Sequence, residues 1–87
     1  MKIKKGFVVK KVAGQDVVIA LGSASKIFNG IIKLNESARF IWDKLAEGAD
    51  RDAIVSALLE EYEIDEQTAG RDVDNFIEQL KGANILE

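Results

Sequence analysis

The stretch Gly30-Ile31-Ile32-Lys33-Leu34-Asn35-Glu36-Ser37-Ala38-Arg39-Phe40-Ile41-Trp42 decides the fold. Its first part, Ile31 to Leu34, is a short apolar run of the kind that forms a strand. Asn35 fits the N-cap of a helix, because its side-chain oxygen can accept a hydrogen bond from a backbone N–H of the first turn. Beyond it, apolar residues follow the i, i+3, i+4, i+7 spacing of one helix face: Ala38, Ile41, Trp42 and Leu45. The pattern therefore changes from strand to helix at Asn35.

The chain before this junction is predicted to form β-structure. Two runs rich in β-branched residues, Phe7 to Val12 and Asp16 to Leu21, flank the connection Ala13-Gly14-Gln15, which predicts a hairpin. Gly22 to Ser25 has the composition of a loop. Asn29-Gly30 leaves two alternatives: a tight hairpin of its own, or a turn that directs the chain into a third strand. We favour the turn.

The chain after the junction is predicted to form three helices. The first spans about residues 37–47 and stops at Gly48, a residue suited to the left-handed position that follows a helix. The second is capped by Asp50 and reaches about Glu63.

The third helix is predicted to be capped by Asp65 and ended by Gly82. Gly70 lies inside it at a cost of roughly 1 kcal/mol relative to Ala, either because backbones pack closely there or for no structural reason. The apolar tail Ile85-Leu86 is expected to fold back and close the core.

The order β-β-β-α-α-α contains no βαβ alternation. It predicts a single α+β domain over residues 1–87, with a three-stranded antiparallel sheet followed by three helices in a winged helix-turn-helix-like arrangement. The predicted core is Val9, Val18, Leu34, Ile41, Trp42, Leu45, Ile54, Leu58, Tyr62, Val73, Phe76, Ile77 and Leu80.

Composition excludes several kinds of chemistry. The 87 residues include no Cys and no His, which removes disulfides, thiol nucleophiles, imidazole bases and nearly every zinc or iron site. No phosphate-binding glycine motif is present, and acidic pairs such as Glu60-Glu61 are expected on helix surfaces. We therefore predict a non-catalytic protein without a metal or cofactor. The absence of a signal peptide or a membrane-length apolar run predicts a cytoplasmic protein that does not bind membranes.

Charge is unevenly distributed along the chain. Residues 1–33 carry seven Lys and one acidic residue, whereas residues 34–87 carry five basic and fourteen acidic residues. A basic sheet could attract an acidic partner segment, although such charge commonly only keeps a surface solvated.

A winged-helix protein that binds nucleic acid, such as a transcription regulator, is the alternative function. A helix that reads DNA needs basic residues to meet phosphates. The third helix and its cap instead carry five acidic residues against Arg71 and Lys81, so we predict no nucleic-acid partner. Trp42 and Phe76 could anchor a partner, but Trp42 is expected in the core. Phe76 is left open between the two roles, because the apolar stripe of the third helix is wide enough to pack the core and still expose one flank.

Several motifs, in this order and spacing, resemble the pyrroloquinoline quinone biosynthesis protein D (PqqD) family. The first runs from Leu34 to Ala38, followed by Ile41 to Leu45 and Gly48. The similarity continues through Ile54, Leu58, Glu61-Tyr62, Ile64-Asp65, Asp72-Val73, Phe76-Ile77, Leu80, Gly82 and Ile85-Leu86.

The resemblance implies a domain that recognises the leader of a ribosomally made precursor peptide and presents it to a modifying enzyme, often a radical-SAM protein. In that family the leader adds as a strand beside the third strand, with the third helix as the other wall. The peptide-binding residues implied here are Ile31, Ile32, Lys33, Leu34, Arg71, Asp72, Asn75, Phe76 and Gln79.

Overall fold

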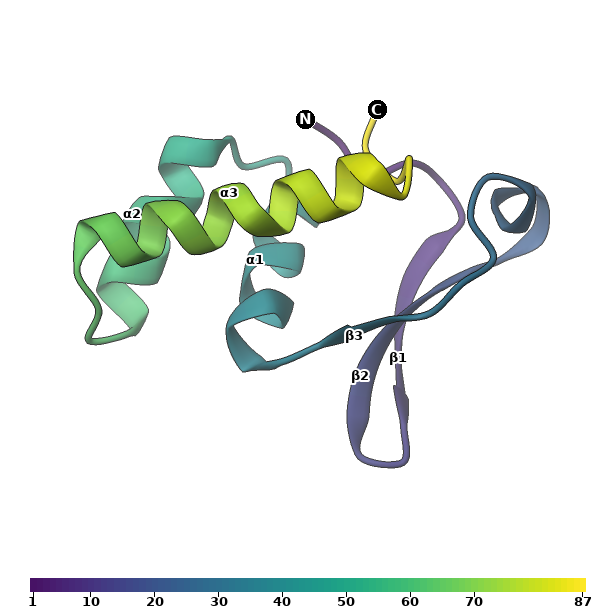
Figure 1. Cartoon of the computed structure of the whole chain (residues 1–87), viewed down its shortest axis with the longest axis horizontal. Helices are drawn as coiled ribbons and strands as arrows, with labels where there is room; N and C mark the ends of the chain where they lie inside the picture. The colour runs from purple at the N-terminus through teal and green to yellow at the C-terminus, as the bar shows by residue number, and fades with distance from the viewer.

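The computed structural model describes residues 1–87 and contains a three-stranded antiparallel sheet followed by three α-helices (Figure 1). The strands are β1 (Phe7–Val12), β2 (Gln15–Ala20) and β3 (Ile32–Leu34), in the spatial order β1-β2-β3. A 3-10 helix, η1 (Gly22–Lys26), connects β2 to β3, and the α-helices are α1 (Glu36–Ala46), α2 (Arg51–Glu61) and α3 (Glu66–Gly82). The predicted α+β fold is confirmed. No helix has the length and apolar character needed to cross a membrane.

The hairpin between β1 and β2 turns through two residues. Ala13 and Gly14 have φ values of 52° and 81°, and positive φ at both positions is what a type I′ turn requires. Gln15 pairs with Val12 and belongs to β2, so the predicted connection Ala13-Gly14-Gln15 is one residue too long. Type I′, the mirror image of the common type I turn, is favoured in two-residue hairpins because its backbone twist matches the right-handed twist of the strands.

The connection from β2 to β3 differs from the predicted loop. It contains η1, in which Ala24 is buried and the Ser25 hydroxyl donates a hydrogen bond to the Gly22 carbonyl at 2.8 Å. The chain bends at Gly30 and enters β3, which pairs with β2 and forms no hairpin of its own with residues 26–28, as favoured. Ile31 lies outside β3 with 66% of its surface exposed, so the third strand begins one residue later than predicted. Its ladder with β2 ends at the pair Val18–Ile32, although β2 itself continues to Ala20 beside β1.

The three helix N-caps are confirmed. The side chains of Asn35, Asp50 and Asp65 each accept a hydrogen bond from the backbone N–H three residues later, at 2.8, 2.8 and 2.6 Å. The first helix starts at Glu36, one residue before the predicted start. Each cap satisfies an N–H that the first turn leaves without a helical partner.

Two helices end in the same way, although only one does so at glycine. After α1, Gly48 has φ 92°, and the Ala49 N–H reaches back to the Lys44 carbonyl at 3.0 Å. This is the hydrogen bond of a Schellman motif. After α3 the left-handed residue is Asn84, with φ 61°, whereas Gly82 is the last helical residue. Helix α3 therefore ends at Gly82 as predicted, but Asn84, and not Gly82, adopts the left-handed conformation that terminates it.

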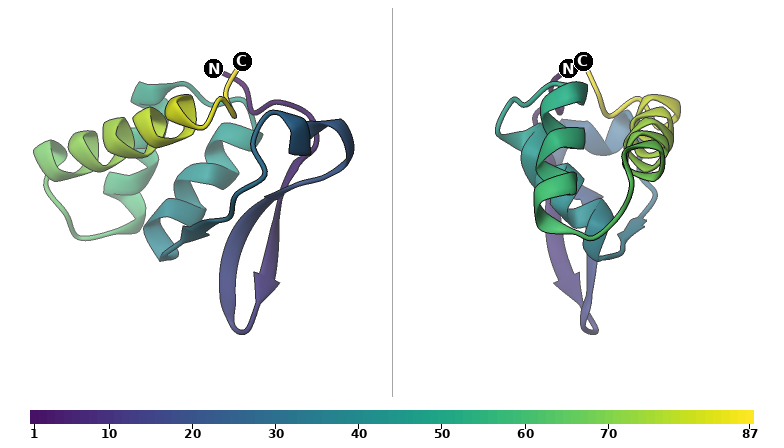
Figure 2. Two further views of the ribbon diagram at one scale, coloured as in Figure 1. Left: turned by 45° about the vertical axis from the view of Figure 1, so that its right-hand side comes forward. Right: turned by 90° about the vertical axis from the view of Figure 1, so that its left-hand side faces the viewer.

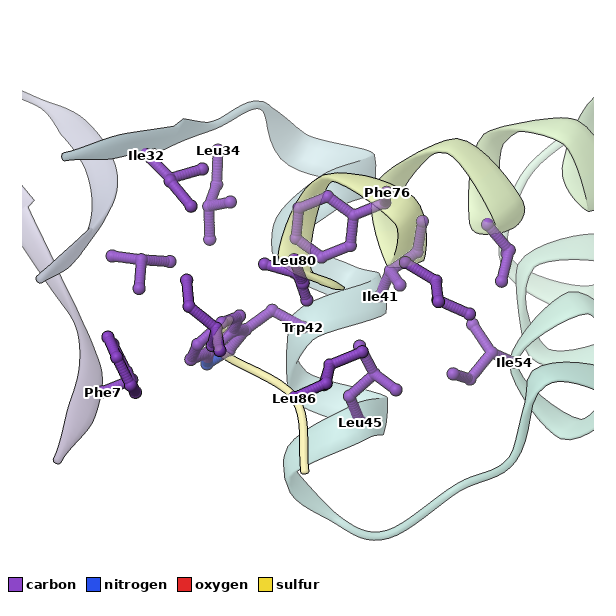
Figure 3. Close-up of a cluster of buried hydrophobic side chains, with 14 of the residues drawn as sticks. Phe7, Ile32, Leu34, Ile41, Trp42, Leu45, Ile54, Phe76, Leu80 and Leu86 are labelled. Carbon is purple, nitrogen blue, oxygen red and sulfur yellow. The ribbon is translucent and has the colours of Figure 1, made fainter. Parts of the chain in front are cut away.

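The helices and the base of the sheet share one core of 18 buried residues (Figure 3). Eleven of the thirteen predicted core residues are buried, including Trp42 at 5% exposure. Val9 and Tyr62 are only half-buried. Val9 packs against the edge of the core from β1, in the hairpin that projects beyond the helices (Figure 1). Tyr62 follows α2 and meets the Phe40 ring edge-on at 5.7 Å. The core also contains Ile85 and Leu86 of the predicted tail, and the core residues that were not predicted are Phe7, Ala24, Ile32, Val55 and Ala69.

The two ends of the chain lie side by side (Figure 2). Ile85 is fully buried and Leu86 nearly so, as predicted for the tail. The backbone pairs Ile3 with Leu86, and the Lys4 N–H donates to the Ile85 carbonyl at 2.8 Å. These contacts fix the end of α3, and with it one wall of the site described next.

Candidate functional site

An open groove of about 510 Å³ lies between β3 and α3. Its apolar floor comes from β3, α1 and α3, and its polar walls come from β3 and α3. The lining residues are Gln15, Lys33, Leu34, Asn35, Ser37, Ala38, Ile41, Asp72, Asn75, Phe76 and Gln79.

The strand register determines which backbone groups of the sheet face its neighbours. In a two-residue hairpin the residues beside the turn, Val12 and Gln15, exchange hydrogen bonds, and such pairs alternate along an antiparallel ladder. Odd-numbered residues of β2 therefore direct their N–H and C=O groups toward β1. The same parity continues past the strand, where the Leu21 N–H donates to the Gly6 carbonyl at 2.7 Å. Even-numbered residues of β2 direct theirs toward β3.

This parity leaves Lys33 with free backbone groups. Asp16 and Val18 of β2 are the residues that hydrogen-bond to β3, through their partners Leu34 and Ile32. Lys33 stands opposite Val17, in the pair that makes no ladder hydrogen bonds. Because β3 is the edge strand, the N–H and C=O of Lys33 point away from the sheet, where another extended chain can pair with them.

The floor of the groove is built from residues that also pack the core. Ile32 and Leu34 alternate with Lys33 and point from β3 toward Phe76 and Leu80 (Figure 3). Leu34 and Phe76 are each only 6% exposed. The floor is therefore a narrow apolar strip that can contact one or two side chains.

The walls carry polar groups that the protein itself leaves unused. Lys33 and Asp72 take part in none of the ion pairs of the chain. The side-chain amides of Asn75 and Gln79 make no hydrogen bond within the protein. These four side chains are available to a ligand without the loss of an internal interaction.

The structure brings six of the nine predicted site residues to the groove: Lys33, Leu34, Asp72, Asn75, Phe76 and Gln79. Ile32 lies beneath it in the core, and Ile31 is exposed just before β3. Arg71 does not line the groove. The lining residues that sequence reasoning missed are Gln15, Asn35, Ser37, Ala38 and Ile41. Four of these come directly after β3 in the strand-to-helix junction. Their closeness in sequence to β3 was the signal that could have predicted them as lining residues.

Arg71 instead lies in a second depression, about 760 Å³, between the start of α2 and α3. There Arg51 donates two hydrogen bonds to Asp74, at 2.9 and 3.1 Å, and its guanidinium covers Gly70. Hydrogen bonding to Arg51 lowers the pKa of Asp74. This depression is larger but has no free strand edge, and Arg51 is already paired. The groove beside β3 is therefore the stronger candidate.

An ion-pair network fixes the end of the groove nearest the hairpin. Asp16 of β2 lies 3.3 Å from the Arg39 guanidinium and 3.6 Å from the Lys11 ammonium. Arg39 also bonds to Asp43 at 2.9 Å, and this hydrogen bond raises the pKa of Arg39. The network connects β2 to α1, on which part of the groove is built.

Comparison with models of known protein families assigns this chain to a family. Residues 11–86 match the family model described as coenzyme PQQ synthesis protein D (PqqD). The chain belongs to the PqqD family. This result confirms the resemblance seen in the sequence motifs. A search of curated proteins found no match.

Two solved structures have the same fold as this PqqD-family chain. One is described as TbiB1 in complex with the TbiA(beta) leader peptide, with a TM-score of 0.80, 29% identity, and coverage of 100% of this chain and 95% of that one. The other is lasso peptide synthetase B1 complexed with the leader peptide, with a TM-score of 0.75, 22% identity, and coverage of 98% and 93%. At 22% identity, the second similarity shows the fold alone.

Proposed function

We propose that this protein binds the leader of a ribosomally made precursor peptide as an extended strand, added antiparallel to β3 in the groove between β3 and α3. The observation that carries the proposal is the free edge of β3, where the register directs the N–H and C=O of Lys33 away from the sheet, without a partner strand. Membership of the PqqD family supports it, as does similarity to structures described as leader-peptide complexes.

Backbone pairing would contribute affinity for any peptide, and side-chain contacts would contribute specificity. Each main-chain hydrogen bond contributes about 0.5–1.5 kcal/mol whatever the peptide sequence. Discrimination among peptides must therefore come from the apolar floor at Leu34 and Phe76 and from the polar groups of Lys33, Asp72, Asn75 and Gln79. Ile31 and Arg71 would act only at the margins of the bound peptide.

The protein would act as an adaptor that presents the leader to a separate modifying enzyme. A chain without Cys or His has few groups for nucleophilic or acid–base catalysis. A radical-SAM enzyme is our proposed partner, and a cytoplasmic location remains a prediction.

Binding to duplex DNA is the less favoured function. Five acidic residues are exposed on α3 and its cap, against two basic residues, Arg71 and Lys81. This excess of negative charge repels phosphates. An electrophoretic mobility shift assay at low salt checks the point, since tight, salt-sensitive retention of duplex DNA would contradict the adaptor role.

A nuclear magnetic resonance titration tests the proposed site. The probe is the synthetic leader of the precursor peptide encoded beside this gene, added to isotopically labelled protein. We expect amide shifts to concentrate at residues 31–35 and 71–79. Shifts confined to the hairpin at residues 7–20, with both of those segments silent, would place the site elsewhere.

A further inference from the structure

The register of the sheet places Lys33 in a row of side chains on the face opposite the helices. Ile32 and Leu34 point into the core, so Lys33, between them, points to the other face. Its partner Val17 also lies outside the core cluster, and Val17 pairs in turn with Lys10 of β1. Lys10, Val17 and Lys33 thus stand side by side across the three strands.

Val17 shows how this row is packed. It is only 5% exposed although it does not belong to the core cluster beneath the helices. Its cross-strand neighbours are Lys10 and Lys33, whose aliphatic stems can cover apolar surface while the ammonium groups stay in water. Neither lysine has an ion-pair partner. The row therefore ends at the free edge of the sheet in an unpaired cation.

A peptide strand added to β3 would extend this row by one side chain. The free N–H and C=O of Lys33 make it one half of a hydrogen-bonded pair, so a single peptide residue stands directly opposite it. Directly opposed residues have Cβ atoms about 4.5–5.5 Å apart and project to the same face. The two peptide residues on either side project to the other face, over Leu34 and Phe76.

We infer that the peptide recognised by this groove carries an acidic residue opposite Lys33, between two residues whose side chains rest on the apolar floor. The inference rests on the proposed function and adds the class of side chain that one peptide position must hold. Lys33 is the lysine of this row nearest to that position, because Lys10 lies two further strand spacings away, about 4.8 Å each. Asp72, on the α3 wall, disfavours an acid at the two inward positions instead.

The expected effect is modest and specific to one position. An opposite-charge pair across neighbouring strands changes Kd by about 1.5-fold to 5-fold relative to a neutral pair, and like charges oppose binding. Because the pair is exposed to solvent, high salt should reduce the preference.

The test uses peptides selected from a random twelve-residue library displayed on messenger RNA, with the full-length protein as target. Contacts between the Lys33 amide and the bound peptide, observed by nuclear magnetic resonance, identify the opposing residue. Synthetic peptides with Glu, Gln or Lys at that residue are then compared. Wild-type protein should bind them in the order Glu, Gln, Lys, and the order should reverse with Lys33→Glu and vanish with Lys33→Ala.

Each outcome bears on a different part of the proposal. Equal binding of the Glu and Gln peptides, or an order unchanged by Lys33→Glu, would overturn the acidic preference while the groove remained the binding site. Selected peptides that bind without contacting Lys33, or a failure to select any peptide, would overturn the proposed function and the inference together. The same substitutions at the two flanking peptide residues serve as the control, since their effects should not follow the charge at position 33.

Discussion

Replacement of Leu58 by alanine tests how α2 is packed against the rest of the core. Leu58 is 1% exposed and belongs to the core cluster. Its truncation removes buried apolar surface and leaves a cavity, a change that costs about 2–5 kcal/mol in comparable cores. A protein of this size has a total stability of roughly 4–13 kcal/mol. The variant should therefore lose a large share of its stability, and its Tm should fall by about 8–40 °C.

Urea denaturation followed by circular dichroism measures this loss. The matched control is Leu21→Ala, the same chemical change at a residue that is 48% exposed, where we expect a loss below about 1 kcal/mol. A Leu58→Ala loss under about 1 kcal/mol, or equal losses at the two positions, would refute the described packing of α2.

Three further predictions concern the helices. Asn35→Ala should lower stability by about 1 kcal/mol, because the α1 cap is lost, whereas Asn35→Asp should keep it; thermal melts distinguish the two. Hydrogen bonds from Thr68 lower the pKa of Asp65, so the folded state binds a proton there less readily than the unfolded state. The stabilisation is thus present above a pH of about 4 and is lost as pH falls through the lower folded pKa. With Asp65→Asn, the free energy of unfolding should therefore fall less steeply as the pH is lowered below about 4. Gly70→Ala should leave Tm unchanged or raised, because alanine favours helix by about 0.5–1 kcal/mol and only the flexible end of Arg51 must move; a clear fall in Tm would show that the guanidinium cannot yield.

Local signals allowed the helices to be predicted from sequence. The caps at Asn35, Asp50 and Asp65 depend on a side chain and a backbone N–H only three residues away, so the sequence contains the whole interaction. Gly48 likewise ends α1 through its own backbone freedom. Asn84 takes the same role after α3 and was overlooked, because asparagine adopts positive φ less often than glycine.

Features that depend on tertiary contacts were less predictable. Residues 22–26 form η1 rather than an irregular loop because Ala24 is buried against the core, which no local pattern reveals. Ile31 is as apolar as Ile32, yet only Ile32 has a partner on β2. The start of β3 was therefore misplaced by one residue.

The groove was predicted in outline and corrected in detail. The order of the elements and the family resemblance indicated an edge strand facing α3, and six of the nine predicted residues line the groove. Arg71 lies outside this groove because packing sets the rotation of α3 about its axis, which turns Arg71 toward the start of α2; its part in peptide binding stays a prediction. The free backbone groups of Lys33 could not be assigned before the pairing of β2 with β3 was known.

Strand addition at β3 is tested most directly by measuring the affinity of the synthetic leader for three proteins: wild type, Lys33→Ala and Lys33→Pro. Both variants lose the ammonium group, but only proline also removes the backbone N–H. Leaving a peptide carbonyl without its donor costs about 1–3 kcal/mol, or 5-fold to 150-fold in Kd. By isothermal titration calorimetry, with thermal melts to verify folding, Lys33→Ala should bind within about 5-fold of wild type and Lys33→Pro at least a further 5-fold more weakly. Equal affinities for folded Lys33→Ala and Lys33→Pro would contradict pairing of the peptide with the edge of β3.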